Sequence, residues 1–152
     1  MVIYSRVTYG LICIILWLLV SACGSDDDII LSNVPNLSFN SLSPTSVQEF
    51  DGPITFTVDY EDGDGDLGEN DPNVKNLYLK DNRNGIIYEY RLQQLAPEDS
   101  NIPITGSFDI VLNNTAITNG SSEQSATFDI YVVDREGNRS NTITSDPLNI
   151  YQ

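Results

Sequence analysis

An alternation of apolar and polar residues with a period of two limits this chain to β structure more strongly than any other feature. Residues 54–60 read ITFTVDY, and Phe128, Ile130 and Val132 fall in phase within the segment 127–133. This spacing is typical of strands that bury one face, because successive side chains of a strand point to opposite sides. The spacing expected of helices is not visible, so the sequence predicts an all-β domain.

Further strands are predicted between turn-forming segments. Residues 77–80 and 86–92 flank DNRNG, and its Asn-Gly pair is a strong hairpin signal because both residues tolerate positive φ. Residues 108–112 form another expected strand, and the turn DREGN leads to a last strand over 142–150. Pro147 predicts an edge position or a break there. Two weaker strands are expected at 37–42 and 47–50.

Seven or eight short strands within about 115 residues predict a single antiparallel β-sandwich. From Pro53 onward the strand order resembles that of an immunoglobulin-like domain, and VVDREGNRSN is similar to the penultimate hairpin of bacterial extracellular modules of this kind. The chain departs from antibody domains in two ways. It has no cysteine pair within the sandwich, and its one tryptophan, Trp17, lies near the N-terminus.

The N-terminus has the layout of a secretory signal. An apolar run from Leu11 to Val20 follows Arg6, and the run is too short for a membrane span. Val20-Ser21-Ala22-Cys23 resembles the lipobox of bacterial lipoproteins, which implies acylation of Cys23 and a membrane anchor. We therefore expect a cleaved signal peptide at 1–22, an acidic flexible tether at 23–35 and an immunoglobulin-like β-sandwich at 36–152.

The residues after Cys23, GSDDD, resemble the export signal of Bacteroidota surface lipoproteins. This resemblance implies an outer-membrane protein that faces the cell exterior. The chain has 22 acidic and 7 basic residues, and residues 23–73 contain no basic residue. Such a charge should repel nucleic acid, so we expect no nucleic-acid partner and divalent cations as counterions.

The segment DYEDGDGDLGENDPN, residues 59–73, is the candidate metal site. Asp62, Asp64 and Asp66 alternate with glycines, so that several hard oxygens can point to one side of a bend, as Ca²⁺ requires. The run resembles the start of an EF-hand loop but has Leu67 where that loop has glycine and Asn73 where it has a bidentate Glu. We expect a structural calcium site in a B-C loop instead. The alternative is a solvated acidic turn.

In the expected topology the B-C loop meets the F-G loop at one end of the sandwich. The latter loop therefore adds candidates to the site, and two further acids of the first loop are second choices. The additional candidate ligands are Asp134, Glu136, Glu69 and Asp71.

The chain has no histidine, which excludes Ser-His-Asp chemistry and histidine-ligated zinc, and we expect no enzyme activity. A binding face is expected on the outward side of the C′-C-F-G sheet, although ordinary strand surface has a similar composition. Its residues are Tyr78, Lys80, Ile87, Arg91, Tyr131 and Val133. Two functions remain: an interaction module for an outer-membrane protein, or a carbohydrate-binding lipoprotein of a glycan-uptake system.

Overall fold

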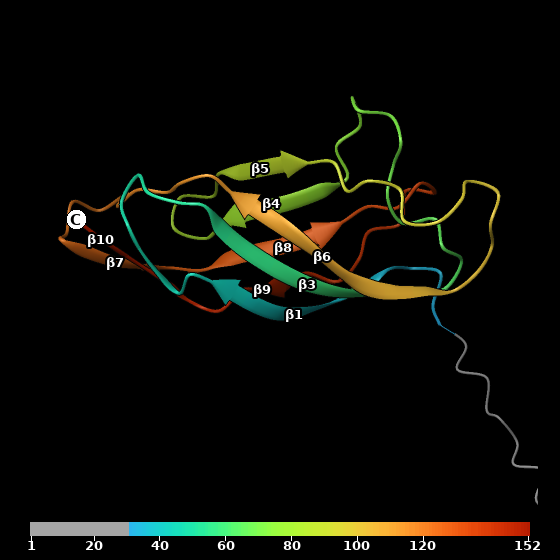
Figure 1. The fold of residues 1–152 in the computed structure, drawn as a ribbon, viewed down its shortest axis with the longest axis horizontal. Coiled ribbons are helices and arrows are strands. Elements are labelled where there is room, and N and C mark those ends of the chain that lie inside the picture. Colours follow the sequence, from blue (N-terminus) through green and yellow to red (C-terminus); the bar gives the residue numbers. More distant parts are fainter. Residues whose placement is uncertain (1–30) are drawn as a thin grey trace, which may run out of the picture.

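The computed structural model describes residues 31–152, and this part of the chain is all-β, with ten strands and no helix (Figure 1). The predicted fold class is therefore confirmed. The predicted signal peptide and Cys23 lie outside the described residues. The strands are β1 (Asn36–Ser43), β2 (Ser46–Gln48), β3 (Ile54–Asp62), β4 (Leu77–Asp81), β5 (Ile87–Tyr90), β6 (Ile104–Leu112), β7 (Glu123–Ala126), β8 (Phe128–Val132), β9 (Ile143–Thr144) and β10 (Leu148–Tyr151).

The strands form three sheets, in the orders β1-β3-β6, β5-β4-β8-β9 and β2-β10-β7. All pairs are antiparallel except β2 with β10, a parallel pair that the sequence did not predict. Only Thr127 separates β7 from β8, and residues 145–147 separate β9 from β10. The β7-β10 pairing thus continues the β8-β9 pairing beyond a break, and Pro147 lies at that break as expected. Two interrupted strands explain why ten are found instead of seven or eight.

The core lies between the β1-β3-β6 sheet and the β5-β4-β8-β9 sheet. Phe56 of β3 contacts Phe128 of β8 edge to face, with 5.1 Å between the ring centroids. Both rings are fully buried, as are Leu79 of β4 and Ile130 of β8. The period-two pattern thus places one face of each strand in a shared core, and burial of each large side chain contributes about 2 kcal/mol.

The β4-β5 hairpin forms around the predicted turn, with Gly85 at a φ of 78°. The order β5-β4-β8-β9 is the one expected for C′-C-F-G. The resemblance to immunoglobulin-like domains remains a prediction at the level of family. The predicted strand at 47–50 was too long: Phe50 has a φ of 69° and lies in a turn, so β2 stops at Gln48.

Candidate metal site

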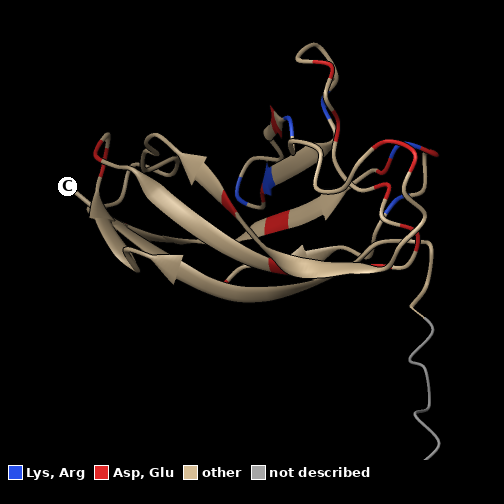
Figure 2. Ribbon diagram, turned by 45° about the vertical axis from the view of Figure 1, so that its right-hand side comes forward, with Lys and Arg blue, Asp and Glu red and all other residues tan. Residues whose placement is uncertain are grey.

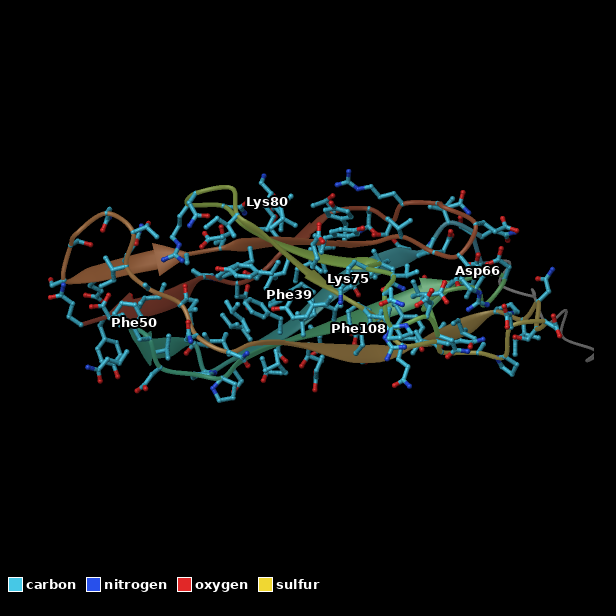
Figure 3. The ribbon with its side chains drawn as sticks, turned by 90° about the horizontal axis from the view of Figure 1, so that it is seen from above. Phe39, Phe50, Asp66, Lys75, Lys80 and Phe108 are labelled. Carbon is cyan, nitrogen blue, oxygen red and sulfur yellow. The ribbon has the colours of Figure 1, made fainter. Side chains whose placement is uncertain are left out.

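Two acidic loops meet at one end of the sandwich. The pairing of Leu77 with Val132 places the start of β4 beside the end of β8, so the loop 63–76 lies next to the loop 133–142. The backbone N–H of Glu136 donates to a carboxylate oxygen of Asp66 at 3.0 Å, across 70 residues of sequence. Acidic segments gather at this end (Figure 2), and Asp66 lies far from Phe50 along the molecule (Figure 3). The predicted meeting of the two loops is confirmed.

Asp62, Asp64 and Asp66, the aspartate cluster, bring one carboxylate oxygen each to within 4.8 Å of one another. The alternating glycines make this arrangement possible. Gly65 has a φ of 76°, and a Cβ there would lie 2.5 Å from the carbonyl oxygen of Ile102. A Cβ on Gly63 would lie 2.5 Å from the carbonyl oxygen of Leu31. Any larger residue at either position would displace a neighbouring chain segment.

The inward oxygens of the aspartate cluster have no hydrogen-bond partner. The Oδ1 atoms of Asp62, Asp64 and Asp66 are all buried and unpaired. Asp62 is 0 % exposed and Asp64 is 7 % exposed. Since an unpaired buried charge is costly and native structures leave few such groups, these three oxygens are arranged as cation ligands are.

The Oδ2 atoms of two aspartates accept hydrogen bonds from backbone N–H groups. Asp62 Oδ2 accepts the backbone N–H of Leu67 at 2.9 Å, and Asp66 Oδ2 accepts that of Glu136 at 3.0 Å. Leu67 itself is fully buried in the core. The loop is therefore anchored by one apolar side chain and by hydrogen bonds that hold one oxygen of Asp62 and one of Asp66 and leave the Oδ1 atom of each unpaired.

Burial and like charges raise the pKa of two members of the cluster. Desolvation, followed by repulsion from Asp64 and Asp134, raises the pKa of Asp62 to about 6. Desolvation, with repulsion from Asp134 and then Asp64, raises the pKa of Asp66 to about 6. The negative charge concentrated here thus opposes ionisation unless a cation offsets it.

The loop 133–142 braces the cluster. Asp134 is 7 % exposed and accepts hydrogen bonds from the backbone and the side chain of Asn138, at 2.7 and 3.0 Å. The Arg135 guanidinium donates to the carbonyl oxygens of Gly68 at 3.1 Å and Gly65 at 3.3 Å. Arg135 therefore holds the backbone of the aspartate loop without neutralising the Oδ1 atoms.

Not all predicted ligands join the cluster. Glu69 Oε1 accepts the backbone N–H groups of Asn70 and Asp71, and the exposed Asp71 accepts that of Asn73. These two acids stabilise local turns of the loop. Glu136 contributes its backbone N–H to the site and is one of the residues that line an adjacent cavity. The four acids that the structure brings together are Asp62, Asp64, Asp66 and Asp134.

The predicted binding face has the expected phase, because Leu77 and Leu79 are buried while Tyr78 is not. Tyr78 and Tyr131 stack across β4 and β8, with 4.7 Å between centroids and 12° between planes. The sequence analysis missed Arg139, whose guanidinium carbon lies 3.8 Å from the centroid of the Tyr131 ring. The cross-strand pairing of the two tyrosines would have been the signal for this stack.

The remaining face residues differ in their surroundings. Ile87 is 46 % exposed, and Lys80 lies 3.8 Å from Asp129 in a surface ion pair. Val133 is half-buried and bridges to the following loop. The Arg91 guanidinium donates at 2.8 Å to the carbonyl oxygen of Asn70 and so contacts the acidic loop, and its place on the binding face stays a prediction.

Residues 31–152 contain no helix that is long and apolar enough to cross a membrane. Comparison with known proteins gives no assignment: no family model matches the chain, and no curated protein and no solved structure matches it.

Proposed function

We propose that this chain is a surface-displayed, non-enzymatic lipoprotein that acts as a binding module and is stabilised by a calcium ion at the aspartate cluster. The observation that carries the proposal is that three aspartates bring one carboxylate oxygen each to within 4.8 Å of one another, and that each has a buried Oδ1 without a hydrogen-bond partner. An ion at this position would offset the charge that burial penalises. It would also tie the loop 63–76 to the loop 133–142.

The donor set favours calcium among common metals. All candidate ligands are carboxylate oxygens, which suit hard cations, and the chain contains no histidine. Mg²⁺ prefers a tight octahedron at about 2.0 to 2.1 Å, whereas Ca²⁺ accepts irregular loops with six to eight oxygens at about 2.3 to 2.6 Å. We therefore assign the site a structural role with calcium preferred over magnesium.

Acylation of Cys23 and display at the outer membrane, facing the exterior, complete the proposal. The described chain enters the fold at the metal end, since the Gly63 N–H donates to the carbonyl oxygen of Ser32 at 2.8 Å. Asn36, the first residue of β1, also pairs with Glu61 near this end (Figure 1). A short tether from an acylated residue 23 would thus hold the aspartate cluster toward the membrane and present the rest of the sandwich outward.

The partner of the module would bind at the stacked face formed by Tyr78, Tyr131 and Arg139. Aromatic and arginine side chains supply much of the binding energy in protein interfaces. An outer-membrane protein is the partner that we propose for this face. The second candidate function, carbohydrate binding in a glycan-uptake system, is favoured by a polar cavity beside the aspartate cluster.

Equilibrium dialysis with radioactive calcium tests the carrying observation. The full chain should bind one ion per molecule, and the Asp64→Asn variant should bind none. Retention of the ion by that variant, or absence of saturable binding by the unmodified chain, would contradict the calcium assignment. Pull-down of the acylated protein from solubilised outer membrane then separates the two functions, since a defined protein partner supports the first and retention on glycans alone supports the second.

A further inference from the structure

A cavity of about 300 Å³ opens beside the aspartate cluster. Its lining consists of Asp64, Asp66, the segment 98–101, Arg135 and Glu136. Asp64 is only 7 % exposed, and its Oδ1 has no hydrogen-bond partner. The volume is at the lower end of the range for small-molecule sites. The same two aspartates, Asp64 and Asp66, therefore belong to both the cation site and the lining of the cavity.

The aspartate cluster does not fill the coordination shell of a calcium ion. Asp62 and Asp66 each use their Oδ2 to accept a backbone N–H, which leaves one Oδ1 apiece directed at the cluster. Asp64 adds its own carboxylate, whereas Ca²⁺ takes six to eight oxygens. The side next to Asp62 is closed, because Asp62 and Leu67 are fully buried. The cavity, which Asp64 and Asp66 line, is the side from which further oxygen ligands would reach the ion.

The charge of the cavity selects the ligand that can take these positions. Five acidic residues and one basic residue, Arg135, line it, and the Arg135 guanidinium donates to backbone carbonyl oxygens of the aspartate loop. The acidic residues of the lining outnumber the basic one by five to one, so an anionic ligand would be repelled. A neutral ligand with two adjacent hydroxyl groups can offer oxygens to the ion and donate its hydroxyl hydrogens to the surrounding carboxylates.

We propose that the calcium ion of this site binds a neutral sugar through two adjacent hydroxyl groups, within the cavity lined by Asp64, Asp66 and Glu136. The inference rests on the proposed calcium site and adds the ligand class. Two hydroxyls of one sugar ring replace two separately bound waters. The surrounding carboxylates then fix the orientation of the ring.

The calcium dependence of binding distinguishes this ligand from a basic partner. A lysine or arginine side chain would also be attracted to the acidic cavity, but it would compete with the ion for the same charge. A sugar bound through the ion requires the ion. Calcium therefore strengthens binding in one case and weakens it in the other.

Affinity electrophoresis of the full chain in detergent provides the test. The gels contain mannan, galactan or dextran as neutral polysaccharides, with calcium or with chelator, and poly-lysine is the basic probe. We expect at least one neutral polysaccharide to retard the protein in calcium and to release it in chelator. Failure of all three to retard it in calcium would overturn the inference, as would equal retardation in calcium and in chelator. Binding of poly-lysine in chelator, with no polysaccharide bound in calcium, would assign the cavity to a basic partner instead.

Glu136→Gln separates the sugar contact from the cation site. It keeps the backbone N–H that Asp66 accepts but removes a carboxylate from the cavity. We expect sugar binding to weaken about 5-fold, the equivalent of one hydrogen bond, while the thermal response to calcium persists. Glu89→Gln, on the exposed side of β5, is the matched control and should change neither property.

The two proposals fail in different ways. If calcium stabilises the unmodified chain but no polysaccharide is retained, the sugar inference is wrong and the cation site stands. If calcium produces neither a stability change nor retention, the calcium assignment itself is wrong. Equal retention of the unmodified chain and Asp64→Asn would show that sugars bind elsewhere on the molecule.

Discussion

Replacing Asp64 with asparagine should make the domain more stable without calcium and unresponsive to calcium. Asp64 is 7 % exposed, and one of its carboxylate oxygens lies within 4.8 Å of one carboxylate oxygen each of Asp62 and Asp66. At an effective dielectric of about 20, two unit charges at that separation repel by about 3 kcal/mol. The neutral amide removes this repulsion and donates hydrogen bonds to carboxylates that otherwise have none.

The size of the calcium response follows from linkage. A ligand that binds only the folded chain stabilises it by RT ln(1 + [L]/Kd), and loops of extracellular modules have Kd values of about 10⁻⁴ to 10⁻³ M. At about 10 mM calcium the gain is about 1.4 to 2.7 kcal/mol. For a domain of this length we expect the Tm to rise by about 4 to 13 °C.

Thermal unfolding followed by circular dichroism, in chelator and in calcium, measures both effects. The unmodified chain should show the full rise in Tm in calcium and only part of it in magnesium. Asp64→Asn should start from a higher Tm in chelator, by several degrees, and show no rise. Asp71→Asn is the matched control, because it makes the same charge change at an exposed position of the same loop that lies outside the cluster.

Two results would refute this reasoning. Equal Tm values for the unmodified chain in chelator and in calcium would reduce the aspartate loop to a solvated turn. A lower Tm of Asp64→Asn in chelator would show that the three carboxylates do not repel one another at neutral pH.

Four further predictions concern other parts of the chain. Cys23→Ser should abolish incorporation of labelled fatty acid and release the protein from the membrane fraction; continued labelling would contradict the lipoprotein assignment. Tyr131→Ala should lower the free energy of unfolding by about 1 kcal/mol in urea, because its ring stacks on a tyrosine and under an arginine, and it should weaken partner binding in pull-down by about 2 kcal/mol or more. The pKa of Asp62 is about 6 in the folded chain and 3.8 ordinarily, so between these pH values the folded state binds a proton that the unfolded state has lost. The Tm in chelator should therefore fall as pH rises from about 4 to about 7. A Tm that rises over this range would contradict the shift. Arg83→Gln should lower the free energy of unfolding, measured in urea, by about 3 kcal/mol, because it removes the 2.6 Å ion pair of Asp81, whose side chain is 1 % exposed. A loss below about 1 kcal/mol would show that solvent reaches this pair.

Several features of this protein follow from local sequence. The alternation in 54–60 and 127–133 predicts which side of β3 and β8 is buried, because a strand turns alternate residues to opposite faces. The Asn-Gly pair predicts the β4-β5 hairpin, and Pro147 predicts the break before β10. The spacing of Asp62, Asp64 and Asp66 likewise predicts a shared side, since glycines between them permit the bend.

Other features depend on chain segments that are distant in sequence. Whether the aspartates are buried is decided by Leu67, which anchors their loop in the core, and by the loop 133–142, which supplies the Glu136 N–H. Glu69 and Arg91 show the opposite case. Composition made Glu69 a candidate ligand, but its carboxylate accepts a backbone N–H of its own loop. Strand phase placed Arg91 on a binding face, but its guanidinium donates to a backbone carbonyl oxygen of the same loop. Hydrogen bonds to loop backbone do not repeat with any sequence period, and so only the tertiary structure decided which charged groups remain unpaired and face one another.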